Sequence, residues 1–117
     1  MKHISYSFSA SDTEAITFAL TLLPSLGLED TQAQATINYQ CCCSAIEKLV
    51  KHDTNITPNE FRVIFASLQA VQFINSGEFK VDFETKQKCS AYLFTVNKLV
   101  SVFDSLCLLQ FHFQNYY

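Results

Sequence analysis

The segment between Thr57 and Gly77 constrains the fold most strongly, because it carries every local signal of an amphipathic helix. Thr57 is a favoured N-cap, Pro58 suits the first helical position, and Glu60 is spaced to complete a capping box. Gly77 follows the pattern and ends it. The apolar residues in between recur at helical spacing and form one stripe: Phe61, Ile64, Phe65, Leu68, Val71 and Ile74. We therefore expect this helix to form the centre of the fold.

Two more helices are expected before this one. Ser11 and Glu14 are spaced as a capping box, which predicts a helix that runs from there to about Leu23. The next helix is expected to begin near Asp30, an acceptable N-cap, and to run to about His52, a residue that suits the last turn of a helix. Its apolar ridge is predicted to consist of Ile37, Cys41, Ala45 and Leu49, with Cys42, Ile46 and Val50 beside it.

A long helix is predicted for the C-terminal third of the chain, from about Thr85. Apolar residues there lie seven apart, with further apolar residues between them: Cys89, Val96 and Phe103, and Tyr92, Leu99 and Leu106. The helix could reach about 30 residues, or roughly 45 Å, whereas the two helices before it come to about 30 Å each. One end of this last helix is therefore expected to overhang.

Two short segments alternate between polar and apolar residues, as half-buried strands do. In residues 2–9 the core-facing side chains would be Ile4, Tyr6 and Phe8. Residues 78–83 show the same alternation. Either these two segments pair as a ribbon, or the second is an extended connection.

Composition narrows the class of protein. The chain of 117 residues is 49% hydrophobic but only 16% charged, against roughly 25% charged in an ordinary domain. Its net charge is −3, and no basic stripe is present to bind phosphates, which argues against nucleic acid and membrane surfaces as partners. No apolar run approaches the roughly 20 residues of a membrane span. Five cysteines, an odd number, and the absence of a recognisable leader predict a cytoplasmic protein.

These observations predict a mainly α fold. We expect a compact four-helix bundle with a long C-terminal helix and an optional two-stranded β-ribbon, built as one helical domain over residues 1–117. The capping boxes and heptad spacing are generic features and indicate no particular family.

No pattern in the sequence supports catalysis, a metal site or a cofactor. Cys41, Cys42 and Cys43 are consecutive, and a helix turns neighbours about 100° apart, so they cannot converge on one ligand. Asp53 and Asn55 begin like a calcium-binding loop, but the glycine and the bidentate glutamate of such a loop are missing. The carboxylates gather at helix starts, where capping explains them. We therefore expect a protein that is not an enzyme.

The C-terminal segment is unusually apolar for a chain end. Five of its residues form the candidate interface: Leu109, Phe111, Phe113, Tyr116 and Tyr117. Four aromatic rings at on the order of 150 Å² each reach the size of a patch that marks an interaction site. The other interpretation is that this segment packs under the first strand and closes the core.

Two function classes remain on the sequence alone. The first is a non-enzymatic protein–protein interaction module (an inhibitor, immunity-type protein or adaptor), whose partner is another protein or a second copy in a homodimer. The alternative is a helical bundle that encloses a small apolar ligand, with a pocket lined by Phe61, Phe65, Tyr92 and Phe103.

Overall fold

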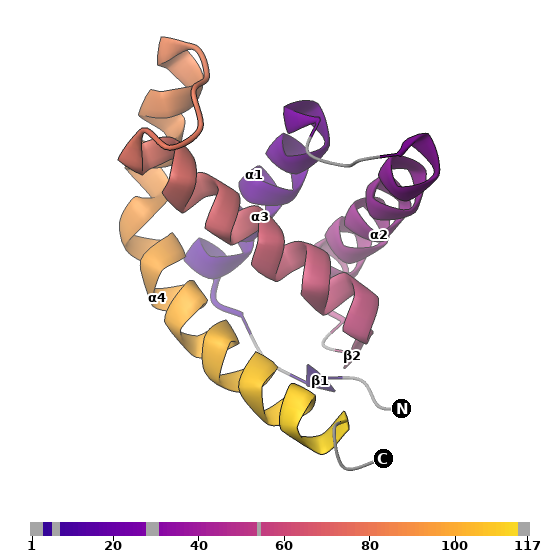
Figure 1. Ribbon diagram of the computed structural model, residues 1–117. Helices are drawn as coiled ribbons and strands as arrows, with labels where there is room; N and C mark the ends of the chain where they lie inside the picture. The colour runs from indigo at the N-terminus through magenta and orange to yellow at the C-terminus, as the bar shows by residue number, and fades with distance from the viewer. Residues whose placement is uncertain (1–3, 6–7, 28–30, 54, 115–117) are drawn as a thin grey trace.

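Four helices packed against one another, with one small β-ribbon, make up most of the described chain in the computed structural model (Figure 1). The structure describes residues 4–5, 8–27, 31–53 and 55–114, with side chains described from residue 8 to residue 105 within those ranges. The predicted fold class is confirmed, including the long C-terminal helix. The elements in chain order are β1 (Ile4–Ser5), α1 (Ala10–Leu22), the 3-10 helix η1 (Leu23–Leu26), α2 (Gln32–Val50), β2 (Asn55–Ile56), α3 (Pro58–Ser76) and α4 (Phe83–Gln114).

Each of the four α-helices is preceded by a residue whose side chain accepts a backbone N–H of the first turn. The four caps are Ser9, Thr31, Thr57 and Asp82. The predicted box at Thr57 and Glu60 is present, with both reciprocal hydrogen bonds.

The two other predicted helix starts were wrong by one or two residues. The first capping box consists of Ser9 and Asp12, and not of Ser11 and Glu14. The acid at the third helical position determines where α1 begins. Asp12 is buried and binds Lys98 of α4, whereas Glu14 is exposed. The cap of α2 is Thr31 and not Asp30.

The ends of α2 and α3 both depend on a left-handed residue. Gly77, at φ 89°, ends α3 as predicted, since glycine takes positive φ without a steric penalty. His52 was expected inside the last turn of α2, but it lies just beyond it with φ 58°. Its backbone N–H donates to the Leu49 carbonyl, which satisfies one of the helix's last acceptors.

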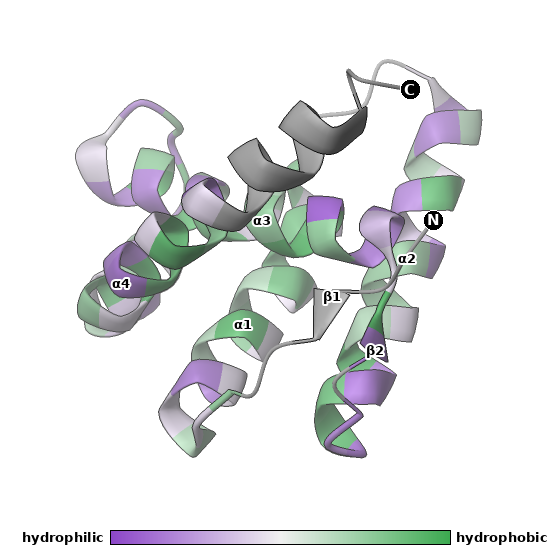
Figure 2. Ribbon diagram, turned by 90° about the horizontal axis from the view of Figure 1, so that it is seen from below, coloured by the Kyte–Doolittle hydropathy of each residue, from purple (hydrophilic) through white to green (hydrophobic). Residues whose placement is uncertain are grey.

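α3 lies at the centre of the bundle and packs against α1, α2 and α4, so the predicted role of this helix is confirmed. In Figure 2 the most hydrophobic ribbon runs through α1 and α3 in the middle of the molecule. Of the predicted stripe, Phe65 is only half-buried, and Val63 takes its place in the core. The largest fully buried side chains packed around α3 include Ile16 and Leu20 of α1 and Val96, Leu99 and Phe103 of α4.

The predicted ridge of α2 is correct only in its second half. Cys42, Ala45 and Leu49 are buried, but Ile37 is 48% and Val50 67% exposed. The periodicity of a sequence predicts which residues share one face of a helix. It does not predict over what length of that helix another helix packs against this face. Most of the side chains in the first nine residues of α2 are exposed.

The ribbon joins a different pair of segments from the one expected. β1 pairs antiparallel with β2, with Ile4 opposite Ile56 and Ser5 opposite Asn55. Residues 78–83 are a connection: Phe79 and Val81 pack against the core, and Phe83 already begins α4. The Asp82 carboxylate accepts the Thr85 N–H at 2.7 Å, which starts the helix there and removes the segment from strand pairing.

α4 is much longer than its neighbours, as predicted. Its 32 residues span about 48 Å, against about 28 Å for the 19 residues of α3. Figure 1 shows α4 curving along one side of the molecule, with α1 and α3 on its concave side. It runs antiparallel to α3, because Phe61 stacks on Phe103 at one end and Gln72 donates to Asn97 nearer the other.

The two aromatic side chains Phe103 and Phe65 should differ sharply in their contribution to stability. Phe103 is 1% exposed and its ring centroid lies 4.9 Å from that of Phe61 and 5.9 Å from that of Phe8. We expect Phe103→Ala to lower the free energy of unfolding by about 3–5 kcal/mol, and Phe65→Ala, at a half-buried position, by about half as much. Denaturant unfolding of both variants measures this. Equal losses would show that the core is centred elsewhere.

Candidate functional site

The C-terminal interface residues lie at or beyond the limit of what the structure describes. The backbone of α4 is helical to Gln114, so Leu109, Phe111 and Phe113 belong to this helix. Their side chains, and all of Tyr116 and Tyr117, are outside the described residues. The interface assigned to them from the sequence stays a prediction.

The four predicted pocket residues separate into two groups. Phe61 and Phe103 stack at 4.9 Å between α3 and α4, each almost fully buried. Tyr92 instead stacks on Phe18 of α1 at 4.8 Å. Its hydroxyl donates to the Glu14 carboxylate at 2.9 Å. Phe65 is half-buried on α3. The structure thus brings Phe61 and Phe103 together and places Tyr92 against α1, while the ligand pocket itself stays a prediction.

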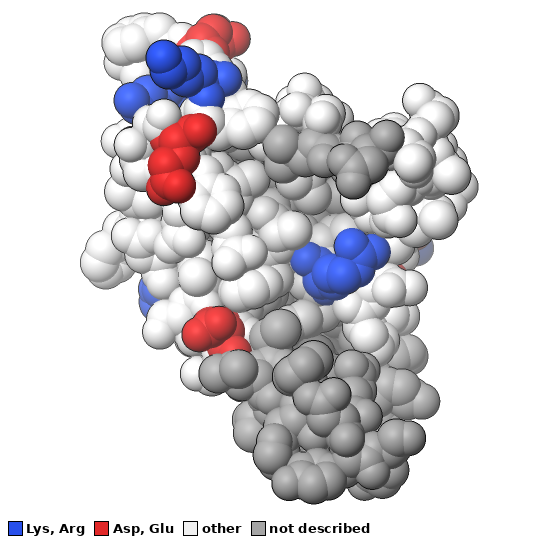
Figure 3. All heavy atoms as spheres, viewed as in Figure 1, with Lys and Arg blue, Asp and Glu red and all other residues white. Residues whose placement is uncertain are grey.

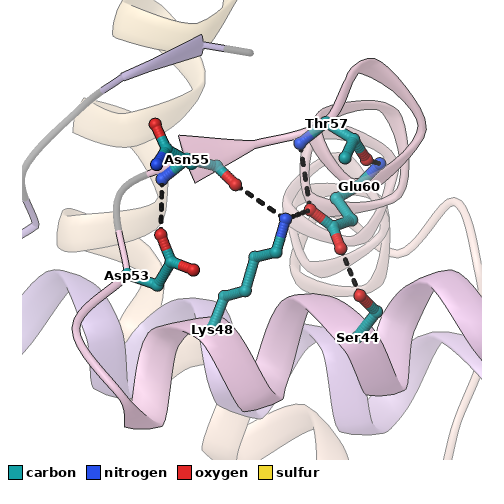
Figure 4. Close-up of polar contacts among 6 residues, drawn as sticks. All are labelled: Ser44, Lys48, Asp53, Asn55, Thr57 and Glu60. Atoms are coloured by element: carbon teal, nitrogen blue, oxygen red, sulfur yellow. Dashed lines mark hydrogen bonds and ion pairs between the residues drawn. The ribbon is translucent and has the colours of Figure 1, made fainter.

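A buried polar cluster around Glu60 is the most elaborate arrangement of chemical groups in the described chain (Figure 4). One Glu60 oxygen accepts the Thr57 N–H at 2.9 Å and the Lys48 ammonium at 2.7 Å. The other accepts the Ser44 hydroxyl. Lys48 also donates to the Asn55 carbonyl at 2.7 Å, so the cluster connects α2, β2 and α3.

The electrostatics of this cluster suit structure rather than catalysis. Burial alone would raise the pKa of Glu60, but the hydrogen bonds from Lys48 and Ser44 outweigh burial and lower it. A carboxylate with a lowered pKa is a weak base, and its two oxygens are already occupied by donors. Lys48 and Ser44 both point to this carboxylate, so neither activates the other. The cluster therefore holds three elements together.

A second buried carboxylate repeats the same arrangement at the start of α1. Asp12 is 4% exposed, completes the cap with Ser9 and accepts the Lys98 ammonium of α4 at 2.9 Å. Burial would raise the pKa of Asp12, but the hydrogen bonds from Lys98 and Ser9 lower it overall. Sequence reasoning found one of these two capping acids and neither lysine. Lys48 could have been found from its i, i+4 spacing from Ser44, which places both side chains on one face of α2.

The cysteines show no shared site. Cys42 and Cys89 are buried, Cys41 is half-buried and Cys43 is exposed. Burial raises the pKa of the Cys89 thiol, which makes it less reactive. Among the described residues, no three His, Cys, Asp or Glu side chains gather as metal ligands do.

The outer face of α4 exposes two phenylalanines that sequence reasoning missed. Phe83 is 76% and Phe94 86% exposed. They lie eleven residues apart, just over three turns, and therefore on the same side of the helix. The spacing of eleven residues could have revealed them, because it places both rings on the face of the helix opposite the heptad residues that face the core.

The line of residues along α4 that joins these two rings carries no charge, and Lys98 borders it one turn beyond Phe94. Within about 40° of the line through Phe83 the helix places only uncharged side chains, all of them exposed. Charged side chains are also sparse on the described surface in Figure 3. We call the following residues the outer stripe: Phe83, Gln87, Ser90, Phe94, Asn97, Ser101 and Ser105.

No protein family, curated protein or solved structure matched the chain when it was compared with them. In the described part of the chain, no helix has both the length and the apolar character needed to cross a membrane.

The two buried carboxylates should make stability depend on acid pH. The pKa values of Asp12 and Glu60 are lowered in the folded protein from ordinary values of 3.8 and 4.5. Such groups contribute stability above the unfolded pKa and lose it as the pH falls through the lower, folded pKa. We expect these two groups to leave the free energy of unfolding nearly constant from about pH 7 to pH 5, and to lower it steadily below about pH 4.5.

The variant Glu60→Gln isolates this effect, because it removes one of the two titrating groups. Its acid limb should be shallower than that of the parent protein when unfolding is measured at several pH values. Glu47→Gln is the matched control, since Glu47 is exposed and paired only with Lys51 on its own helix. An acid limb of unchanged slope in Glu60→Gln would contradict this account of the cluster.

Proposed function

We propose that the protein is a non-enzymatic protein–protein interaction module, of the inhibitor, immunity-type or adaptor kind, that binds another protein through the outer face of α4. The observation that carries the proposal is the 86% exposure of Phe94, with Phe83 at 76% on the same side of the helix. Single exposed apolar residues are ordinary on protein surfaces, but aligned aromatic rings in an uncharged stripe are characteristic of interfaces.

A bound partner would remove these exposed rings from water, which is energetically favourable. Burial of a phenylalanine side chain contributes about 2–3 kcal/mol, and rigid aromatic residues are among the commonest anchors of interfaces. Ser90 and Ser101, on the same stripe, are small enough to let another backbone approach closely. A partner helix or a shallow apolar groove fits such a surface.

The C-terminal residues belong to the same proposal. The backbone at Leu109, Phe111 and Phe113 continues α4 beyond the outer stripe, so the candidate interface from the sequence includes residues of the same helix. Free thiols at Cys41, Cys43 and Cys89 are consistent with a reducing compartment, and we propose that the protein acts in the cytoplasm.

Site-specific photo-crosslinking tests this function directly. Phe94 is replaced by benzoylphenylalanine, which keeps an aromatic ring at the same position, and the protein is irradiated in the cells that express it. We expect one discrete covalent adduct with a protein. The control places the same amino acid at Tyr39, an aromatic residue of α2 that is 57% exposed.

The two positions must differ for the proposal to stand. An adduct at position 94 that is absent from position 39 supports binding through α4. The absence of any adduct at position 94, or the same adducts at both positions, would refute the proposed surface.

A further inference from the structure

We propose that the outer stripe of α4 binds a second copy of this chain, with the two α4 helices antiparallel across a twofold axis close to Phe94. This inference rests on the proposed function and names its partner. It follows from the arrangement of charges beside the stripe, from the shape of α4 and from the area that the exposed rings provide.

The charges beside the stripe are self-complementary only in the antiparallel arrangement. Lys86 and Asp104 are both exposed and lie eighteen residues apart, which is five turns, so both occupy the same flank of α4. The midpoint between them is position 95, next to Phe94. In an antiparallel pair centred there, each Lys86 lies opposite the partner's Asp104. In a parallel pair the two copies would present this flank on opposite sides of the contact, so Lys86 and the partner's Asp104 would not meet.

The ion pairs among the described residues involve neither of these two groups. Lys88 pairs with Glu84 away from the stripe, and Lys98, on the opposite flank of the stripe, pairs with Asp12 of α1. Within the described residues, neither the Lys86 ammonium nor the Asp104 carboxylate forms an ion pair. Two intermolecular pairs would therefore form without breaking any pair inside one copy.

The shape of α4 places the contact at its middle. The concave side of the helix faces α1 and α3, so the outer stripe lies on the convex side (Figure 1). Two convex helices touch first near their midpoints, where Phe94 of each copy would meet. Phe83 would then lie over the partner's Ser105 and Gln87 near the partner's Ser101. Lysine has a side chain long enough to span the wider gap at the ends.

The area involved predicts a weak dimer. Four phenylalanine rings bury on the order of 600 Å² in total, about half of the smallest standard interface, and the small polar residues of the stripe add the rest. The dimer should therefore form in a concentration-dependent manner, with a dissociation constant on the order of micromolar or weaker.

Sedimentation of the purified full chain with charge-swap variants tests the arrangement. We expect Lys86→Glu and Asp104→Lys each to weaken self-association about tenfold, because each creates two like-charge contacts. The double variant should return to within about threefold of the parent, since it restores opposite charges. Lys51 is exposed at the end of α2, and the variant Lys51→Glu controls for the change in net charge. It should leave self-association unchanged.

Phe94→Ser should weaken self-association about tenfold or more, whereas Tyr39→Ser should not. Thermal unfolding of each variant verifies that the fold is intact; Phe94 is so exposed that its loss should not destabilise the monomer. Self-association that resists Phe94→Ser, or a double charge variant no better than the single ones, would overturn the antiparallel pairing.

The outcomes also separate this inference from the proposed function. A purified chain that stays monomeric up to about 1 mM, together with a crosslinked adduct to a different protein at position 94, refutes the second copy but leaves the interaction surface intact. A monomeric chain with no adduct refutes both.

Discussion

Two carboxylates, Asp12 and Glu60, hold this bundle together from the starts of two helices. Each is nearly fully buried, accepts a backbone N–H from the N-cap of its own helix, and binds a lysine on a neighbouring helix. A buried carboxylate without a partner is strongly unfavourable. Each acid therefore fixes where its helix begins and, at the same time, where the neighbouring helix lies. Asp12 connects α1 to α4 across 86 residues of sequence, and Glu60 connects α2 to α3.

These connections leave the core to be filled by apolar packing around α3. They also leave the outer stripe of α4 exposed, although one of its residues, Asn97, accepts a hydrogen bond from Gln72 of α3. The pKa values of the buried Asp12 and Glu60 are lowered, and the oxygens of both carboxylates accept hydrogen bonds. These two acids therefore stabilise the contacts between helices. What the molecule offers to the outside is apolar surface on a helix with few charges. Function is therefore better sought in what covers α4 than in a reaction at the buried clusters.

Features that depend on interactions between neighbouring residues were predicted correctly from the sequence, and features that depend on distant residues were not. The start of α3 was predicted correctly because Thr57, Pro58 and Glu60 act within one turn. The start of α1 was not, because Ser9 and Ser11 are both plausible caps and the choice depends on Lys98, far away in sequence. The partner of β1 was missed for the same reason: the alternating pattern of residues 78–83 resembles a strand, but Asp82 and Thr85 commit its end to α4.

The candidate surface was harder to foresee than the fold. Phe83 and Phe94 share a helix with buried apolar residues, and only the position of α4 against α1 and α3 shows that these two rings point away from the core. The sequence instead drew attention to the C-terminal aromatic residues, whose side chains lie outside the described residues. The exposed phenylalanines lie on α4, and the C-terminal aromatic residues lie on the same helix or follow it.

Solvent accessibility of the Phe94 ring, measured by NMR as a function of protein concentration, tests the central claim most directly. A soluble paramagnetic agent broadens the signals of exposed rings, and Phe94 and the half-exposed Phe73 of α3 provide a probe and a control in one sample. If α4 is covered by a second copy, broadening of the Phe94 signals should decrease as the protein is concentrated, while that of Phe73 stays constant. A Phe94 ring that remains as accessible in concentrated as in dilute solution would contradict the account.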